Sequence, residues 1–183
     1  MPKLQTWHMT IVAVYTAMTA AVGLLLAPVP NLELISAAIF LGGYLFGLRK
    51  GIFIGICGAA LFSIFNPIGS GLAYPPLLVA QICCYAVLAV WGAMVSRFLL
   101  EERPIRRRLI LGGTGLAYTV GYSVAVSVAS FIASGFKPAV WPALLLSGIA
   151  ASLIHILVNT AIFAMVVPVL MDRVRRQGVL SEW

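Results

Sequence analysis

Two short apolar segments within residues 31–69 are joined only by the basic turn at 48–51, of sequence LRKG, and this arrangement constrains the fold. Because the turn leaves no room for a loop, we expect the segments to form an antiparallel helical hairpin. In a lipid bilayer only helices and closed barrels satisfy the backbone hydrogen bonds. The glycines at Gly43, Gly47 and Gly51 follow one another at four-residue spacing, which favours close packing inside a helical bundle.

The composition excludes a water-soluble domain. The 183 residues are 62% hydrophobic and only 9% charged, with a mean hydropathy of +1.05. The first apolar run, at about 10–27, lacks a small-residue cleavage site and is soon followed by another span, so we expect it to be retained rather than removed as a signal peptide. The chain is therefore predicted to be a single transmembrane domain over residues 1–183.

A helical membrane span needs about 20 apolar residues. By this measure the sequence predicts an all-α integral membrane protein with six transmembrane helices. They are expected at 8–27, 33–48, 51–66, 76–100, 108–134 and 140–170.

The cationic residues predict the orientation in the membrane. Every Lys and Arg except Lys137 falls at the N-terminus, at the C-terminus or in a loop on their side. By the positive-inside rule, both termini are expected in the cytoplasm, at a bacterial inner membrane. The same rule explains the net charge of +7 without a nucleic-acid partner, and contact of the basic loop 103–108 with anionic lipid headgroups is a secondary reading.

Polar and aromatic side chains gather in the predicted outer loops and the outer ends of the helices. The candidate substrate-binding residues are Asn31, Glu33, Asn66, Tyr74, Gln81, Lys137, Trp141, His155 and Asn159. An ionisable group at a membrane boundary is costly to bury and therefore points to function.

A structural explanation stands beside each of these candidates. Glu33 or Asn31 could cap the helix that follows. His155 could be a satisfied core histidine and Lys137 a solvated loop cation, while outer Trp and Tyr residues often form an interfacial belt.

The sequence offers no chemistry typical of an enzyme. At membrane depth it offers one acid and one histidine without a clear partner, and the sequence contains no G-x-x-x-x-G-K-[ST] nucleotide site. Cys57, Cys83 and Cys84 lack metal-ligand spacing, so no metal or catalytic cofactor is expected. A thiolate at Cys83 or Cys84 could ligate the cobalt of cobalamin, but an apolar helix disfavours the thiolate form.

Three features together resemble the substrate-binding S components of energy-coupling factor (ECF) transporters. The first helix carries Ala13, Ala17 and Ala21, which make one face nearly flat. NLELIS at 31–36 is followed by GGYLFGLRKG at 42–51, and FNPIG at 65–69 leads into a helix that opens near Gln81. The resemblance spans nearly the whole chain, including its size and predicted topology.

The resemblance implies a six-helix membrane protein that binds a vitamin or related micronutrient from outside. In that family the S component docks through its first helix on a membrane-embedded T component driven by two ATPase subunits, and topples to release its ligand inside. By this likeness Ala13, Ala17 and Ala21 would contact the T component. The outer loops and the outer ends of the last three helices would hold the ligand, and the vitamin is not assigned.

Two other functions stay open. A membrane scaffold of the MreD type would need no cavity, and a solitary vitamin transporter, for example for cobalamin, would need no ATPases. A scaffold has no reason to bring Glu33, Gln81, His155 and Asn159 to one place, so their convergence is the feature that separates the hypotheses.

Overall fold

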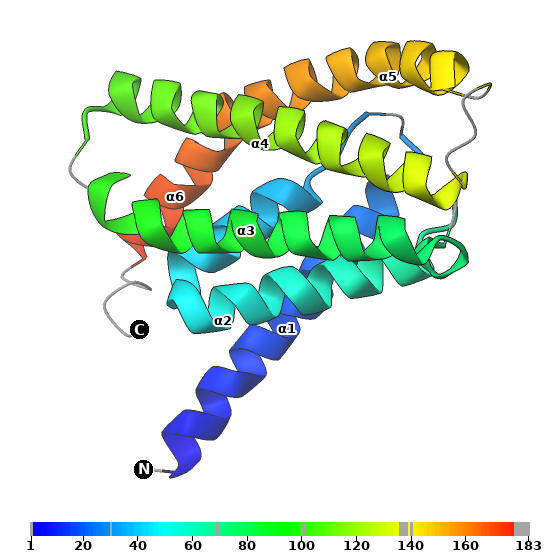
Figure 1. Cartoon of the computed structure of the whole chain (residues 1–183). Coiled ribbons are helices and arrows are strands. Elements are labelled where there is room, and N and C mark those ends of the chain that lie inside the picture. The colour runs from blue at the N-terminus through cyan, green and yellow to red at the C-terminus, as the bar shows by residue number, and fades with distance from the viewer. Residues whose placement is uncertain are drawn as a thin grey trace.

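The computed structural model describes residues 2–29, 31–68, 70–99, 102–135, 139 and 141–177. Every regular element among them is helical (Figure 1). The long helices are α1 (Pro2–Leu26), α2 (Ile35–Phe65), α3 (Pro75–Leu99), α4 (Pro104–Ala133) and α5 (Trp141–Ala161). The short ones are the 3₁₀ turn η1 (Gly71–Ala73), the π-helix η3 (Ile162–Val166) and α6 (Val167–Arg176).

Five helices in the described ranges are long and apolar enough to cross a membrane. They are Thr6–Leu26, Ile35–Phe65, Pro75–Ser96, Pro104–Ala133 and Ser152–Arg176. The chain is thus an all-α protein with the helices of a multi-pass membrane protein. The predicted count of six spans is not confirmed.

The difference in count lies in α2, which contains a sharp reversal at Gly47. Its φ of 77° and ψ of −177° belong to a region that is open essentially to glycine alone. A Cβ atom added at Gly51 would lie 2.7 Å from the Cα of Gly43, whereas residues eight apart in a straight helix are separated by about 12 Å. The arms 35–46 and 48–65 therefore fold back on each other.

This reversal confirms the predicted hairpin and corrects its boundaries. Separate helices were expected at 33–48 and 51–66, with the turn at 48–51, but the helical hydrogen bonding continues through the basic residues and the reversal is at Gly47. The first arm rises only about 18 Å, which is short of a hydrocarbon core of about 30 Å.

The other helix boundaries also differ from the predicted ones. α1 begins at Pro2 rather than at residue 8, and α4 begins at Pro104 rather than at 108, with proline in the first turn where no backbone donor is needed. The predicted helix 140–170 consists of α5, η3 and α6. Pro168 is the second residue of α6, and its missing N–H and its ring disturb regular α-helical bonding in the turn before it, where η3 lies.

α2 and α3 form the most closely packed pair of helices. A Cβ atom added at Gly43 would overlap the carbonyl oxygen of Ala89, and one at Gly92 would overlap that of Phe40. The ring of Phe40 is fully buried and meets Phe163 edge-to-face, with the ring centroids 5.4 Å apart. This contact joins the hairpin to the C-terminal part of the chain.

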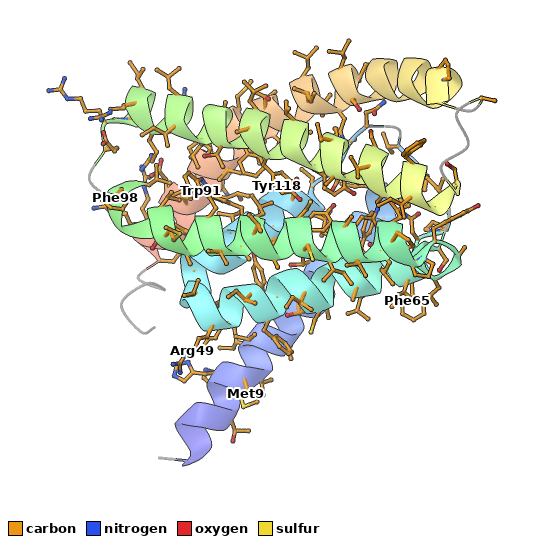
Figure 2. The ribbon with its side chains drawn as sticks, viewed as in Figure 1. Met9, Arg49, Phe65, Trp91, Phe98 and Tyr118 are labelled. Atoms are coloured by element: carbon orange, nitrogen blue, oxygen red, sulfur yellow. The ribbon has the colours of Figure 1, made fainter. Side chains whose placement is uncertain are left out.

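The ends of the helices sort into two opposite ends of the bundle. The start of α1, the turn in α2, the end of α3, the start of α4 and the end of α6 lie at one end of the bundle. The end of α1, the start of α2, η1, the end of α4 and the start of α5 lie at the other (Figure 1). Arg49 and Phe98 mark the first end and Phe65 the second (Figure 2). We call these the basic end and the loop end.

Candidate functional site

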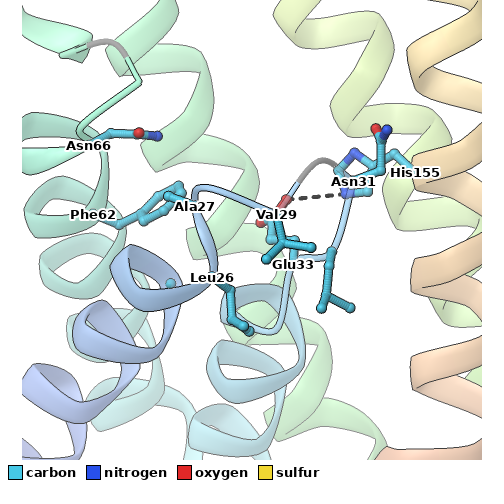
Figure 3. A pocket seen from close by; sticks show the side chains of 10 residues that line it. Leu26, Ala27, Val29, Asn31, Glu33, Phe62, Asn66 and His155 are labelled. Atoms are coloured by element: carbon cyan, nitrogen blue, oxygen red, sulfur yellow. Dashed lines mark ion pairs between the residues drawn. The ribbon is translucent and has the colours of Figure 1, made fainter.

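Glu33 lies at the loop end, in the connection just before α2. The N-cap residue of α2 is Leu34, and no side chain makes a capping hydrogen bond there, so neither Glu33 nor Asn31 caps the helix in that way. The carboxylate of Glu33 instead accepts a hydrogen bond from the hydroxyl of Tyr85 on α3. Its other oxygen, Oε2, lies 3.1 Å from Nε2 of His155 on α5 (Figure 3). Glu33 therefore links the start of α2 to two other helices.

Three tyrosines, Tyr85, Tyr118 and Tyr122, surround this carboxylate, and we call them the tyrosine cluster. Their ring centroids are 5.6 to 6.2 Å apart. The ring of Tyr122 also meets that of His155 edge-to-face at 6.2 Å, and its hydroxyl accepts a hydrogen bond of 3.2 Å from Nε2 of Gln81. Gln81 thus reaches His155 through Tyr122.

The tyrosine cluster was missed by the sequence analysis. Tyr118 and Tyr122 are four residues apart on α4, and Tyr85 follows Gln81 by four residues on α3, so each pair shares one helical face. This four-residue spacing is the feature of the sequence from which the cluster could have been predicted. The hydroxyl of Tyr118 is buried and has no hydrogen-bond partner among the described residues.

A cavity of about 180 Å³ lies next to Glu33. It is lined by Gly23, Leu26, Ala27, Val29, Asn31, Leu32, Glu33, Phe62, Asn66 and His155. Phe62 and Asn66 border the side opposite His155 (Figure 3). The backbone at Asn31 adopts a φ of 61°, a left-handed conformation that asparagine tolerates better than most residues. Four of the predicted site residues, Asn31, Glu33, Asn66 and His155, therefore share this cavity.

Asn159 does not line the cavity and is engaged in helix packing. Its side chain is only 1% exposed. Its Oδ1 accepts a hydrogen bond of 3.0 Å from Ser36 on α2, and its Nδ2 donates one of 2.6 Å to the hydroxyl of Thr119 on α4. Glu33 and His155 thus meet as expected. Gln81 does not line the cavity and approaches them only through Tyr122, and the amide of Asn159 is used by neighbouring helices.

The remaining predicted residues fall outside this site or outside the described part of the chain. Tyr74 is 56% exposed and ends η1 without lining the cavity. Lys137 lies outside the described residues, and so does the side chain of Trp141, whose backbone begins α5.

The alanine face of α1 points away from the bundle. Ala13, Ala17 and Ala21 are all exposed, whereas Thr16 and Ala20, on the adjacent face of the helix, are buried. Figure 1 shows the N-terminal half of α1 diverging from the other helices. The face is therefore available for contact with another helix.

The three cysteines are free, and Cys83 is exposed on α3. The described ranges hold no group of three or more His, Cys, Asp or Glu side chains placed to bind a metal ion. Comparison of the chain with protein-family models, curated proteins and solved structures finds no match. Function is therefore inferred from the site itself.

Proposed function

We propose that this protein is a membrane-embedded binding subunit for the uptake of a small molecule of the vitamin or micronutrient class. The observation that supports this best is the gathering of Asn31, Glu33, Asn66 and His155 around one cavity at the loop end. Holding a carboxylate and an imidazole at a membrane boundary is costly, and helix packing alone does not require it. A cavity that combines apolar side chains with a few placed polar groups is typical of a small-molecule site.

The orientation of the bundle supports uptake from outside. If the two arms of α2 count as separate crossings, the chain crosses six times and both termini lie in the cytoplasm. The basic residues then face inward, as the positive-inside rule requires. The cavity opens toward the outer side of a bacterial inner membrane, where a nutrient arrives.

The proposal includes an energising partner of the ECF type, with a T component and two ATPase subunits. Its support is the exposed alanine face of α1, because small residues let a partner helix approach closely. The cavity volume of about 180 Å³ is below the range of roughly 300–1,000 Å³ for drug-sized ligands. We therefore expect a compact ligand, or the anchoring part of a larger one.

One observation favours a scaffold of the MreD type instead. The carboxylate of Glu33 already contacts Tyr85 and His155, so it could serve only to hold α2, α3 and α5 together. In that case the cavity would be a packing defect without a ligand.

Native mass spectrometry of the purified protein separates these functions. After expression in a rich medium, we expect the wild-type protein to carry a small molecule that Glu33→Gln loses. Glu102→Gln is the matched control, because it changes an acid at the basic end, far from the cavity. A wild-type protein that carries only lipid, and that no vitamin stabilises against heat, would favour the scaffold.

A further inference from the structure

The described residues of the cavity lining include an acidic side chain but no Lys or Arg. Among them, Glu33 carries the only carboxylate. The other polar groups are the amides of Asn31 and Asn66 and the imidazole of His155. An anionic ligand would meet a like charge in a site of low dielectric constant, where repulsion is strong. The lining therefore suits a ligand with a positive charge.

The two oxygens of the Glu33 carboxylate have different partners. Oε1 is held by the hydroxyl of Tyr85, whose side chain is fully buried. Oε2 lies 3.1 Å from Nε2 of His155, but that buried nitrogen makes no aligned hydrogen bond. One oxygen is thus fixed by the protein, and the other faces a nitrogen that satisfies it poorly.

Aromatic rings pack beside the imidazole of His155. Tyr122 meets the imidazole edge-to-face at 6.2 Å, and Tyr85 and Tyr118 lie within 5.6 and 6.0 Å of Tyr122. Aromatic rings attract cations at distances up to about 6 Å from their centroids. The buried hydroxyl of Tyr118, which has no partner in the described part of the chain, leaves one further hydrogen-bonding position unused.

We propose that the site selects a cationic ligand, and that its protonated nitrogen takes the place of the His155 imidazole against Oε2 of Glu33. This inference rests on the proposed function and names its ligand class: a compact organic ammonium or protonated nitrogen heterocycle. In the absence of ligand, the imidazole lies against Oε2 in the position that the ligand's nitrogen would take, without an aligned hydrogen bond. Binding then exchanges one nitrogen for another at Oε2, while Tyr85 continues to donate its hydrogen bond to Oε1.

The inference makes His155 a competitor of the ligand. A variant that keeps a flat ring but has no nitrogen, His155→Phe, removes this competition and adds a ring that attracts cations. We expect it to bind a cation about two- to fivefold more tightly than the wild type. If His155 were instead a direct ligand contact, the same variant would lose binding.

The test compares benzylammonium with benzoate, two probes of similar shape and opposite charge, on the full chain in detergent. Titration calorimetry should show binding of benzylammonium and none of benzoate. Glu33→Gln should weaken benzylammonium binding at least tenfold, since a hydrogen bond to a charged group is lost. Asn66→Asp adds a second carboxylate to the lining and should strengthen it, which keeps the test decisive if Glu33→Gln does not fold.

Three results would overturn the inference: benzoate binding as well as benzylammonium, loss of benzylammonium binding in folded His155→Phe, or no gain in Asn66→Asp. Native mass spectrometry tests the uptake function independently of these titrations. A co-purified anionic molecule would overturn the cationic ligand class and leave the uptake function standing. If the protein binds neither probe and carries no small molecule, both the cationic ligand class and the uptake function are refuted.

Discussion

Arg107 on α4 and Asp172 on α6 form an ion pair at the basic end, with Nη2 and Oδ2 2.7 Å apart. The side chain of Arg107 is only 9% exposed, whereas that of Asp172 is 44% exposed. A buried cation therefore depends on a partly solvated anion. The sequence marked Arg107 only as one of several loop cations that set the orientation, and the structure makes it a contact between two helices.

This pair predicts unequal effects at two acids of the basic end. Asp172→Ala should lower the free energy of unfolding by about 1–3 kcal/mol, because it leaves a buried guanidinium without its partner. Glu102→Ala removes a pair whose atoms are 3.2 Å apart and whose cation, Arg106, is 71% exposed, so it should cost at most about 0.5 kcal/mol. Denaturant unfolding in detergent measures both, and equal losses would contradict the assignment.

The packing of α2 on α3 predicts a strong dependence on Gly43. Gly43→Ala would push its methyl group into the carbonyl oxygen of Ala89 and should destabilise the protein by about 1–3 kcal/mol or more. Gly121→Ala on α4 is the matched control. A Cβ atom there meets no atom of the described residues within 4 Å, so that variant should be neutral or slightly more stable. A thermal melt that ranks the two variants the other way would refute the close helix contact.

The alanine face of α1 predicts where the proposed T component docks. Ala17→Trp should abolish coupled uptake while ligand binding stays nearly unchanged, because a large ring would hold the partner helix away. Met18→Trp, at a neighbouring position that is 59% exposed but off the alanine face, is the control and should transport normally. Normal assembly and transport by Ala17→Trp would exclude this face as the docking surface.

Asn159 and Glu33 should separate stability from ligand binding. Asn159→Ala breaks hydrogen bonds to Ser36 and Thr119 and should lower stability by about 1–2 kcal/mol, with benzylammonium affinity little changed. Glu33→Gln should lower the benzylammonium affinity and leave the stability little changed, because glutamine can still accept the hydrogen bond from Tyr85. Calorimetry and thermal unfolding of the same samples give both quantities. If folded Asn159→Ala loses much of its benzylammonium affinity, Asn159 belongs to the ligand site after all.

The proposed orientation can be tested with single cysteines in a background without Cys57, Cys83 and Cys84. A cysteine at Tyr74, an exposed position at the loop end, should react with an impermeant reagent added to intact cells. A cysteine at Gln177, near the C-terminal end of α6, should react only after the membrane is opened. The reverse pattern would invert the topology.

The sequence by itself determined the helical class and the reversal in the middle of α2. Hydropathy predicts helices because the backbone hydrogen bonds of a membrane helix are satisfied within a few residues of the chain. The two short apolar runs around Arg49 and Lys50 indicated a hairpin for the same local reason. The exact turn, at Gly47, needed a backbone conformation that neither hydropathy nor charge reveals.

The tertiary structure alone decided which polar groups meet. Glu33 and Asn159 looked alike in the sequence, as polar residues near the outer ends of helices. How each helix is rotated about its axis depends on contacts such as Gly43 with Ala89 and Gly115 with Phe163, which join residues far apart in the chain. Those contacts turn Glu33 toward the cavity and Asn159 toward Thr119, because close packing permits few rotations of one helix against another.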